Sequence, residues 1–303
     1  MNRRRFLRKS LGSAVSMTMA TTVPLSLLGS ARTVAAEEYR AVVCVLLAGG
    51  ADSFNILVPR SQLAYNRYQA RRSDLALSQN DLLPLDGEHE GVQFGLHPAM
   101  SSLQQRFNAG QATMVTNVGP LVEPTTRDTL EAETARLPLG LFSHSDQILS
   151  WQTATPANRA GTGFGGRLVD ALPGANTGLA LAGNISLSGN NSFQAGAATG
   201  SYAISANRGI QTIAGFDNDL FKRSFESLMS DATASNLQTV YGNKMQSAID
   251  AGDVFSSALS QATTLSTPFA EDSFSSAMKR IAELASVHEQ LGVSRQTFFV
   301  TFG

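Results

Sequence analysis

The sequence predicts an α/β protein with a mainly parallel sheet, and three observations carry that prediction. Residues 40–47 form a short apolar run rich in β-branched side chains, as expected of a buried strand. Residues 97–110 then place apolar side chains at helical spacing, and residues 112–119 form a second β-rich run. A strand, a helix and a strand in this order predict a right-handed parallel crossover.

The first residues predict export. Residues 2–10, NRRRFLRKS, contain the consecutive Arg3 and Arg4 of a twin-arginine signal, and residues 11–28 are only weakly apolar. An uncleaved anchor would need about 20 strongly apolar residues. We therefore expect residues 1–36 to be a cleaved twin-arginine signal peptide, and the mature protein to be periplasmic or otherwise exported without a stable membrane anchor.

Charge and cysteine content exclude several classes of protein. Six of the 23 basic residues lie in residues 1–36, which leaves 17 against 24 acidic residues and a net charge near −7. This balance argues against a nucleic-acid partner. Cys44 is the single cysteine, so an intrachain disulfide and a cysteine metal cluster are both excluded. We expect Cys44 to be a small core residue.

The rest of the chain continues the α/β pattern. We expect helices that begin in 142–153 and 163–172, followed by an irregular stretch with weak strands at 179–209. A largely helical region is expected at 217–262, an amphipathic helix at 272–292 and a last strand at 295–303. Trp151 is expected to pack against the sheet. Because the chain stops at a strand that follows a well-patterned helix, we expect that strand to be a bare sheet edge and the sequence to be C-terminally truncated.

Asp52 is the first candidate ligand. It follows Gly49 and Gly50 at the end of the first strand, and ligands of open α/β sheets bind outside the carboxyl ends of strands. Its carboxylate could hold a divalent cation through hard oxygen atoms. A strand-end turn, in which the Asp side chain bonds its own backbone, is the simpler interpretation. The local sequence leaves both interpretations open.

Ser143 is the candidate nucleophile. In FSHSD, Ser143 is followed three residues later by Asp146, a spacing that resembles a capping box. A helix start also favours anions, so Ser143 could be a cap or a nucleophile under a phosphate or sulfate group, and the local sequence favours the cap. His144 beside it could be a metal ligand, a general base or a hydrogen-bonded surface histidine.

Other motifs give weaker evidence for a functional site than Asp52 and Ser143 do. His97 precedes Pro98 and is expected to help start a helix, while His89 and His288 are expected to be structural or solvated. The sequence has no G-x-S-x-G, no G-x-G-x-x-G and no Walker loop, so nucleotide cofactors lack support. GTGFGG at residues 161–166 is glycine-rich but lacks the lysine of a phosphate-binding loop.

Several stretches together resemble the DUF1501 family of exported bacterial proteins. That family is largely uncharacterised and is similar in fold to the alkaline phosphatase–sulfatase superfamily. The resemblance implies a three-layer αβα fold, one or two divalent metals at the carboxyl ends of a parallel sheet, and a hydroxyl nucleophile at a helix start. The matching stretches are the twin-arginine leader, LLAGGADSFNILVP, LALSQNDLLPLDG, FGLHPAM, VTNVG, LFSHSDQILSWQT and RQTFFVTFG.

The resemblance assigns roles to particular residues. It implies that Asp52 is a metal ligand, that Ser143 is the catalytic nucleophile, and that His144 is a catalytic or metal-binding residue. Many relatives have Arg where Phe142 stands here, which puts an anion-clamping arginine in doubt. Thr126 and Arg127 are a weaker alternative. The metal would be zinc, manganese, magnesium or calcium.

The resemblance also frames the expected function. The family's later Asp- and His-bearing segments, which resemble the remaining metal ligands, are absent after Gly303, so residues 37–303 are expected to be the N-terminal part of an alkaline-phosphatase-like domain. The complete protein is expected to hydrolyse a small anionic phosphate or sulfate ester by in-line displacement. The alternative is a non-catalytic envelope scaffold whose protein partner contacts residues 179–209.

Overall fold

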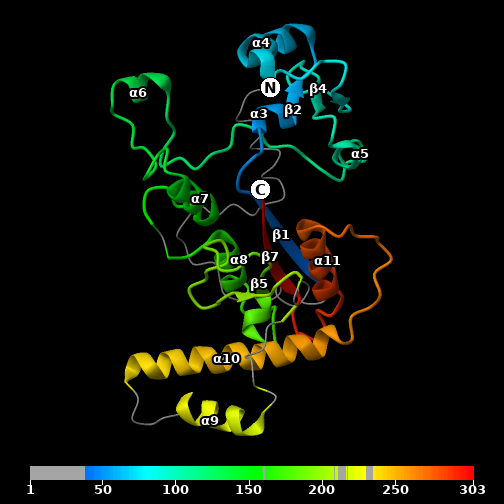
Figure 1. Ribbon diagram of the computed structural model, residues 1–303. Helices are drawn as coiled ribbons and strands as arrows, with labels where there is room; N and C mark the ends of the chain where they lie inside the picture. The colour runs from blue at the N-terminus through cyan, green and yellow to red at the C-terminus, as the bar shows by residue number, and fades with distance from the viewer. Residues whose placement is uncertain (1–37, 160, 208, 211–215, 217, 230–234) are drawn as a thin grey trace, which may run out of the picture. The chain divides into compact units, whose positions relative to one another are not determined.

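The computed structural model describes residues 38–159, 161–207, 209–210, 216, 218–229 and 235–303 (Figure 1). The expected signal peptide, residues 1–36, lies outside this described part. The described chain divides into two compact units, residues 50–118 and residues 38–49 with 119–303. Each unit has its own hydrophobic cluster. No helix in the described ranges is both long and apolar enough to cross a membrane.

The larger unit is built on a four-stranded parallel sheet. Its strand order is β1-β7-β5-β6, in which β1 is Arg40–Leu47, β7 is Arg295–Phe302, β5 is Asn184–Ser186 and β6 is Tyr202–Ala203. All three pairings are parallel, with Arg40 opposite Arg295 and Ile185 opposite Phe298. The prediction of a mainly parallel α/β sheet is therefore confirmed.

Strand β7 carries a different layer of structure on each of its faces. Phe298 and Val300 belong to the larger hydrophobic cluster, which contains residues of α10 (Asn236–Leu259) and α11 (Ser273–Ser286). Phe299 points the other way and stacks on Phe193 at 5.8 Å between ring centroids. Because successive strand residues alternate between faces, helices cover the sheet on one side and the Phe193 segment covers it on the other.

Most of the other helices of this unit form where the sequence predicts them, and α6 (Arg127–Glu131) is one that was not predicted. The expected helices at 142–153, 163–172, 217–262 and 272–292 are confirmed. Their start signals are side-chain caps: the Asp272 carboxylate accepts the Ser275 N–H at the start of α11. The remaining elements are α6 (Arg127–Glu131), α7 (His144–Thr153), α8 (Phe164–Asp170), η3 (Ala180–Gly183) and α9 (Asp219–Met229).

Three expectations about the sheet are wrong. Strand β1, expected to be buried, lies at the sheet edge and exposes Val42 and Val45, whereas β7, expected to be the bare edge, lies between β1 and β5 and is buried over most of its length. An apolar run predicts a strand, but its position in the sheet depends on which distant strands pair with it. Residues 112–119 form no strand, so the expected crossover through them is wrong too.

Two side-chain expectations are also wrong. Trp151 is 52% exposed and does not pack against the sheet, because α7 turns its Ser150 and Thr153 side inward instead. Cys44 is half-buried on the edge strand and does not lie in the core. Burial nonetheless raises the pKa of its thiol.

The irregular stretch 179–209 contributes to the core of this unit. The Gln194 side chain is fully buried and donates from Nε2 to the carbonyls of Ile185 and Thr297, at 2.9 Å each. It therefore bridges β5 and β7. Ile185 and Phe193 are buried as well, so part of this stretch is internal.

The smaller unit contains a three-stranded antiparallel sheet of order β2-β4-β3. Val58, Tyr65 and Leu82 form its buried cluster. The Tyr65 hydroxyl donates to the Leu77 carbonyl at 2.7 Å, which fixes the loop after the longest helix. Its elements are α3 (Ser53–Ile56), β2 (Leu57–Pro59), α4 (Gln62–Arg72), η2 (Ser73–Leu75), β3 (Leu83–Pro84), β4 (Phe94–Leu96) and α5 (Ser101–Asn108).

Candidate functional site

Ser143 caps the ten-residue helix α7, as the capping interpretation predicts. Its Oγ accepts the Asp146 N–H at 3.4 Å and lies 3.2 Å from the Ser145 Oγ. The N–H groups of a helix's first turn have no partners within the helix. The hydroxyl therefore lies at the positive end of the helix dipole, where an anion is favoured.

The turn before Ser143 holds Phe142 in an unfavourable backbone conformation. The Ser143 N–H donates to the Gly140 carbonyl at 2.8 Å, and Phe142 has φ +72° at the third position of this turn. Glycine normally occupies such a position because a Cβ atom clashes there. The Phe142 side chain is 85% exposed, so burial does not offset the strain.

An ion pair lies beside the Ser143 hydroxyl. Arg159 approaches one oxygen of the Asp146 carboxylate, with its Nε and Nη2 each 2.9 Å away. Arg159 and, to a smaller extent, the Ser143 hydroxyl hold the pKa of Asp146 below its usual value. Asp146 is thereby a carboxylate at neutral pH, and it neutralises much of the charge that Arg159 brings to the helix start.

Gly140 allows this arrangement because it has no side chain. A Cβ atom there would lie 2.3 Å from an Asp146 carboxylate oxygen. Its φ of +63° also favours glycine. The sequence LGLFSHSD therefore combines a close backbone approach, a strained turn and a helix cap in eight residues.

The other residues assigned by resemblance have different surroundings. His144 is the first residue of α7 and is exposed. Thr126 caps the five-residue helix α6, where its Oγ1 accepts the Thr129 N–H at 3.2 Å. Arg127 is bonded to Glu131 at 2.6 Å. The partners of both residues, Thr129 and Glu131, belong to α6 itself.

Asp52 belongs to the smaller unit, whereas Ser143 and His144 belong to the larger one. Its Oδ1 accepts the Phe54 N–H at 3.2 Å, so Asp52 caps α3, and its carboxylate also pairs with Arg72. This is the strand-end turn of the simpler interpretation. Gly50 before it has φ +68°, which breaks the extended chain after β1.

No group of three or more potential His, Cys, Asp and Glu ligands gathers anywhere in the described ranges. The other histidines have local partners. His97 accepts the Ala99 N–H at its Nδ1, 3.1 Å away, and so helps start α5. His288 stacks on Tyr39 at 4.1 Å, and the Tyr39 hydroxyl donates to Gln296. Burial raises the pKa of Tyr39 to about 12.

The glycine-rich GTGFGG stretch serves packing. A Cβ atom at Gly163 would lie 1.8 Å from the Ser192 carbonyl oxygen, and one at Gly166 would lie 2.3 Å from the Ala195 carbonyl carbon. These glycines bring α8 against the backbone that precedes and follows Gln194. The contact explains why glycines occur here without a phosphate-binding lysine.

A comparison with protein-family models shows which family the chain belongs to. The model for the protein family of unknown function DUF1501 matches residues 39–266, about three quarters of the sequence. The chain belongs to the DUF1501 family. The match covers Asp52, Ser143 and His144 together with Arg159, which the sequence analysis did not single out. Neither the curated proteins nor the solved structures contain a significant match to this chain.

Arg159 and Phe142 are the two features of this DUF1501 site that sequence reasoning missed or misread. Arg159 is 16 residues after Ser143, and no spacing rule links an arginine in a loop to a helix start before it. Phe142 appeared only as the residue in place of an arginine. A bulky residue immediately before a helix cap gives no sign of positive φ in the sequence.

Proposed function

We propose that this DUF1501 protein is an exported, alkaline-phosphatase-like hydrolase of phosphate or sulfate esters with Ser143 as its nucleophile. The observation that carries the proposal is the position of the Ser143 hydroxyl. It caps the first turn of a ten-residue helix by accepting the N–H of Asp146, whose carboxylate pairs with the guanidinium of Arg159. Helix N–H groups and an arginine are the donors that stabilise equatorial oxygens during phosphoryl or sulfuryl transfer.

The proposed reaction has two displacements. The Ser143 Oγ attacks the phosphorus or sulfur atom, its bond to the leaving alcohol breaks, and the Oγ proton passes to His144 as general base. The leaving alkoxide departs on the opposite side and takes a proton from solvent water, which leaves hydroxide for the second displacement. The hydroxide then attacks the serine ester and releases inorganic phosphate or sulfate. The protonated His144 returns its proton to the Ser143 Oγ when the serine ester is broken, which restores the Ser143 hydroxyl.

Arg159 has a defined part in this proposal. Its Nε and Nη2 are directed at Asp146, and Nη1 forms no bond to another residue in the described part of the chain. The Asp146 carboxylate would hold the guanidinium in position, while Nη1 contacts a substrate oxygen. Arg159 would then take the place of the arginine that many relatives have before the serine.

The proposal that a divalent metal takes part has Asp52 and His144 as separate candidate ligands, because the two residues belong to different units. In this structure Asp52 is engaged with Arg72 and with the Phe54 N–H, which does not fit a metal ligand, and the two displacements use only Ser143, His144 and Arg159. Metal analysis of the protein isolated from periplasm tests this part. One or two equivalents that are lost in Asp52→Ala would support it, and a metal-free active protein would refute it.

The decisive experiment is turnover of 4-nitrophenyl phosphate and 4-nitrophenyl sulfate by Ser143→Ala. We expect no turnover in this variant. The melting temperature should change by only a degree or two, because the lost cap costs only about 1 kcal/mol. Ser145→Ala is the matched control, because it removes the neighbouring hydroxyl and should keep most of the activity. Equal activity of Ser143→Ala and the wild type would remove Ser143 as the nucleophile.

The alternative, a non-catalytic envelope scaffold, has one observation in its favour. Helix α9 and the first turns of α10 expose six large apolar side chains, at Leu220, Phe221, Leu228, Leu237, Val240 and Tyr241. Such a surface is typical of a protein-contact site. A stoichiometric partner that dissociates on Leu237→Asp, together with the absence of turnover, would favour the scaffold over the hydrolase.

A further inference from the structure

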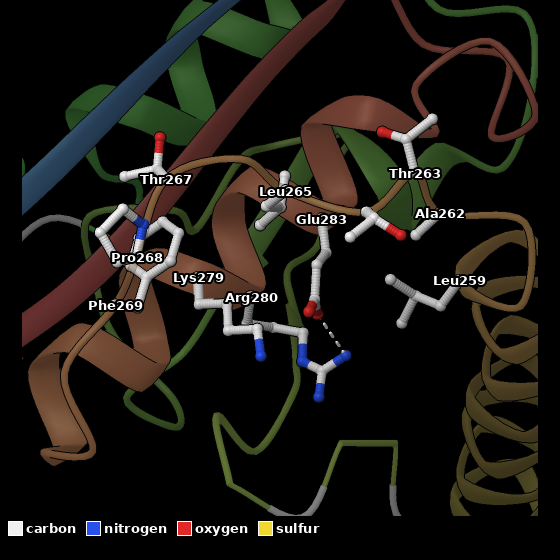
Figure 2. Close-up of a pocket in the computed structure, with 11 residues that line it drawn as sticks. Leu259, Ala262, Thr263, Leu265, Thr267, Pro268, Phe269, Lys279, Arg280 and Glu283 are labelled. Atoms are coloured by element: carbon white, nitrogen blue, oxygen red, sulfur yellow. Dashed lines mark ion pairs between the residues drawn. The ribbon is translucent and has the colours of Figure 1, made fainter.

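A pocket separate from the Ser143 site opens on the surface of the larger unit. It has a volume of about 540 Å³ and lies between the end of α10, the loop 262–269 and helix α11. Pockets of this size accept small organic molecules. None of its lining residues comes from α7 or the turn before it. Figure 2 shows the loop and the side chains that α11 contributes.

Three charged side chains of α11 form one wall of this pocket. Arg280 donates from Nη1 to the Glu283 carboxylate at 2.8 Å, and both side chains are largely buried. Lys279 forms no ion pair with any residue in the described ranges, so the wall carries one uncompensated positive charge. Figure 2 shows the three side chains together, with the Arg280–Glu283 pair as a dashed line.

Arg280 also has an unused hydrogen-bond donor. Its Nε is shielded from solvent and has no hydrogen-bond partner among the residues that the structure describes. A buried donor without a partner costs about 1–3 kcal/mol, so an acceptor that reaches this nitrogen would be bound favourably. Guanidinium and ammonium groups together match the oxygens of a phosphate, sulfate or carboxylate.

A second, smaller pocket of about 240 Å³ meets the same charged side chains. Lys279, Arg280 and Glu283 line both pockets, and the smaller one adds Asn207 and Ser276. An amide and a hydroxyl are further donors for anionic oxygens. The donors of two pockets therefore converge on one stretch of α11.

Apolar side chains flank the charged residues of the larger pocket. Its apolar lining residues include Leu259, Leu265, Pro268 and Phe269. In Figure 2, Leu259 lies to one side of the charged residues, and Pro268 and Phe269 lie to the other. A bare inorganic ion would leave these side chains without a contact, whereas a ligand with an apolar body would cover them.

We propose that this pocket binds a small amphipathic anion, with its oxyanion head group on Lys279 and Arg280 and its apolar body against Leu265, Pro268 and Phe269. The proposal does not depend on hydrolysis at Ser143. The head group can be a phosphate or a carboxylate, because both offer the oxygens that these donors need. Glu283 holds the Arg280 guanidinium in place and disfavours a cationic ligand.

Calorimetric titration of the full chain tests the proposal with four probes: hexyl phosphate, hexanoate, inorganic phosphate and hexylamine. We expect hexanoate to bind with one equivalent, hexyl phosphate to bind in this pocket with one equivalent besides its binding as an ester at Ser143, inorganic phosphate to bind at least about tenfold more weakly, and hexylamine not to bind. The relative affinity of hexyl phosphate and hexanoate identifies the preferred head group. Equal binding of hexylamine, or no binding of either anion, would overturn the proposal.

Single-residue variants test where on the protein the anion binds. Lys279→Met keeps the aliphatic stem of an exposed residue and should weaken hexyl phosphate about tenfold, whereas Lys244→Met, on the exposed part of α10, should leave binding unchanged. Ser143→Ala should leave the binding of hexanoate unchanged, because hexanoate is not an ester substrate of the proposed hydrolase. Loss of hexanoate binding in Ser143→Ala with normal binding in Lys279→Met would place the anion at α7 and refute the pocket, although it would leave the proposed hydrolase intact.

Discussion

The Arg159 guanidinium bonds the Asp146 carboxylate 2.9 Å away, beside the hydroxyl of Ser143. The pair links the segment after α7 to the first turn of the same helix. Because Asp146 is mostly buried and Arg159 mostly exposed, the carboxylate is the fixed partner and the guanidinium is presented to solvent. The exposed edge of the guanidinium is therefore the part that an anionic substrate would meet.

Replacement of this guanidinium should weaken substrate binding more than it affects folding. We expect Arg159→Gln to raise the KM for 4-nitrophenyl phosphate about tenfold, because one charge-assisted hydrogen bond to the anion is lost. Arg127→Gln removes an arginine whose side chain is 86% exposed and bonded to Glu131, and it should leave KM unchanged. Steady-state kinetics on both variants measure the difference. Equal KM values would show that Arg159 does not contact the substrate.

Phe142→Gly should stabilise the protein. The φ of +72° costs a side chain about 1–2 kcal/mol, and glycine avoids that cost while adding some freedom to the unfolded chain. We expect a net gain of up to about 1 kcal/mol in the free energy of unfolding, measured in urea. Leu141→Gly, in the same turn without positive φ, should destabilise. A stabilised Phe142→Gly with reduced turnover would show that the ring serves function.

Gly166→Ala should destabilise the larger unit strongly. The added methyl group would lie 2.3 Å from the Ala195 backbone, so α8 must move away from the segment that carries Gln194. We expect a loss of about 3 kcal/mol or more in thermal or urea unfolding. Gly161→Ala is the matched control, because a Cβ atom there meets nothing within 4 Å, and it should change stability by less than about 0.5 kcal/mol. Similar losses in both variants would contradict the close approach.

Asp170 should make the free energy of unfolding depend on pH in the acid range. Burial by itself would raise the pKa of its carboxyl, but hydrogen bonds from Thr199, Ala197 and Ala198 lower that pKa below the usual value. The native carboxyl therefore binds fewer protons than the unfolded one. Its contribution is complete above the unfolded pKa of about 4 and is lost as the pH falls toward the lowered native pKa.

Urea unfolding at pH 6 and at pH 3 measures this contribution. Asp170→Asn should cost about 2 kcal/mol at pH 6 and much less at pH 3, because the hydrogen bonds to the charged oxygens are already weakened there. Asp250→Asn, at an exposed position on α10, should show no such difference between the two pH values. An equal cost of Asp170→Asn at both pH values would show that the loop at 197–199 does not depend on the carboxylate.

Local patterns predicted the elements of this fold better than their arrangement. The caps at Ser143 and Asp272 and the alternation in β7 depend on neighbouring residues, so the sequence indicates them directly. The place of β1 at the edge depends on a strand some 250 residues away, which no local pattern encodes. Residues 112–119 have β-rich composition but no partner strand, and the tertiary context overrides their propensity.

The residues of the candidate site were likewise predicted from the sequence only in part. Ser143 could be found because a cap has a sequence signature. Arg159 could not, since a loop arginine reaches Asp146 only after the chain has turned behind α7. Asp52 was identified as a strand-end carboxylate, but its partner Arg72 comes from the far end of α4, so the ion pair that occupies it was not predicted.

The pairing of β1 with β7 also affects synthesis. Roughly 250 residues must be translated after β1 before its partner exists, which takes on the order of ten seconds or more at about 5–20 residues per second. Throughout that interval the valines of β1 have no neighbouring strand on the nascent chain. The β1–β7 ladder of the sheet therefore closes only after translation of β7.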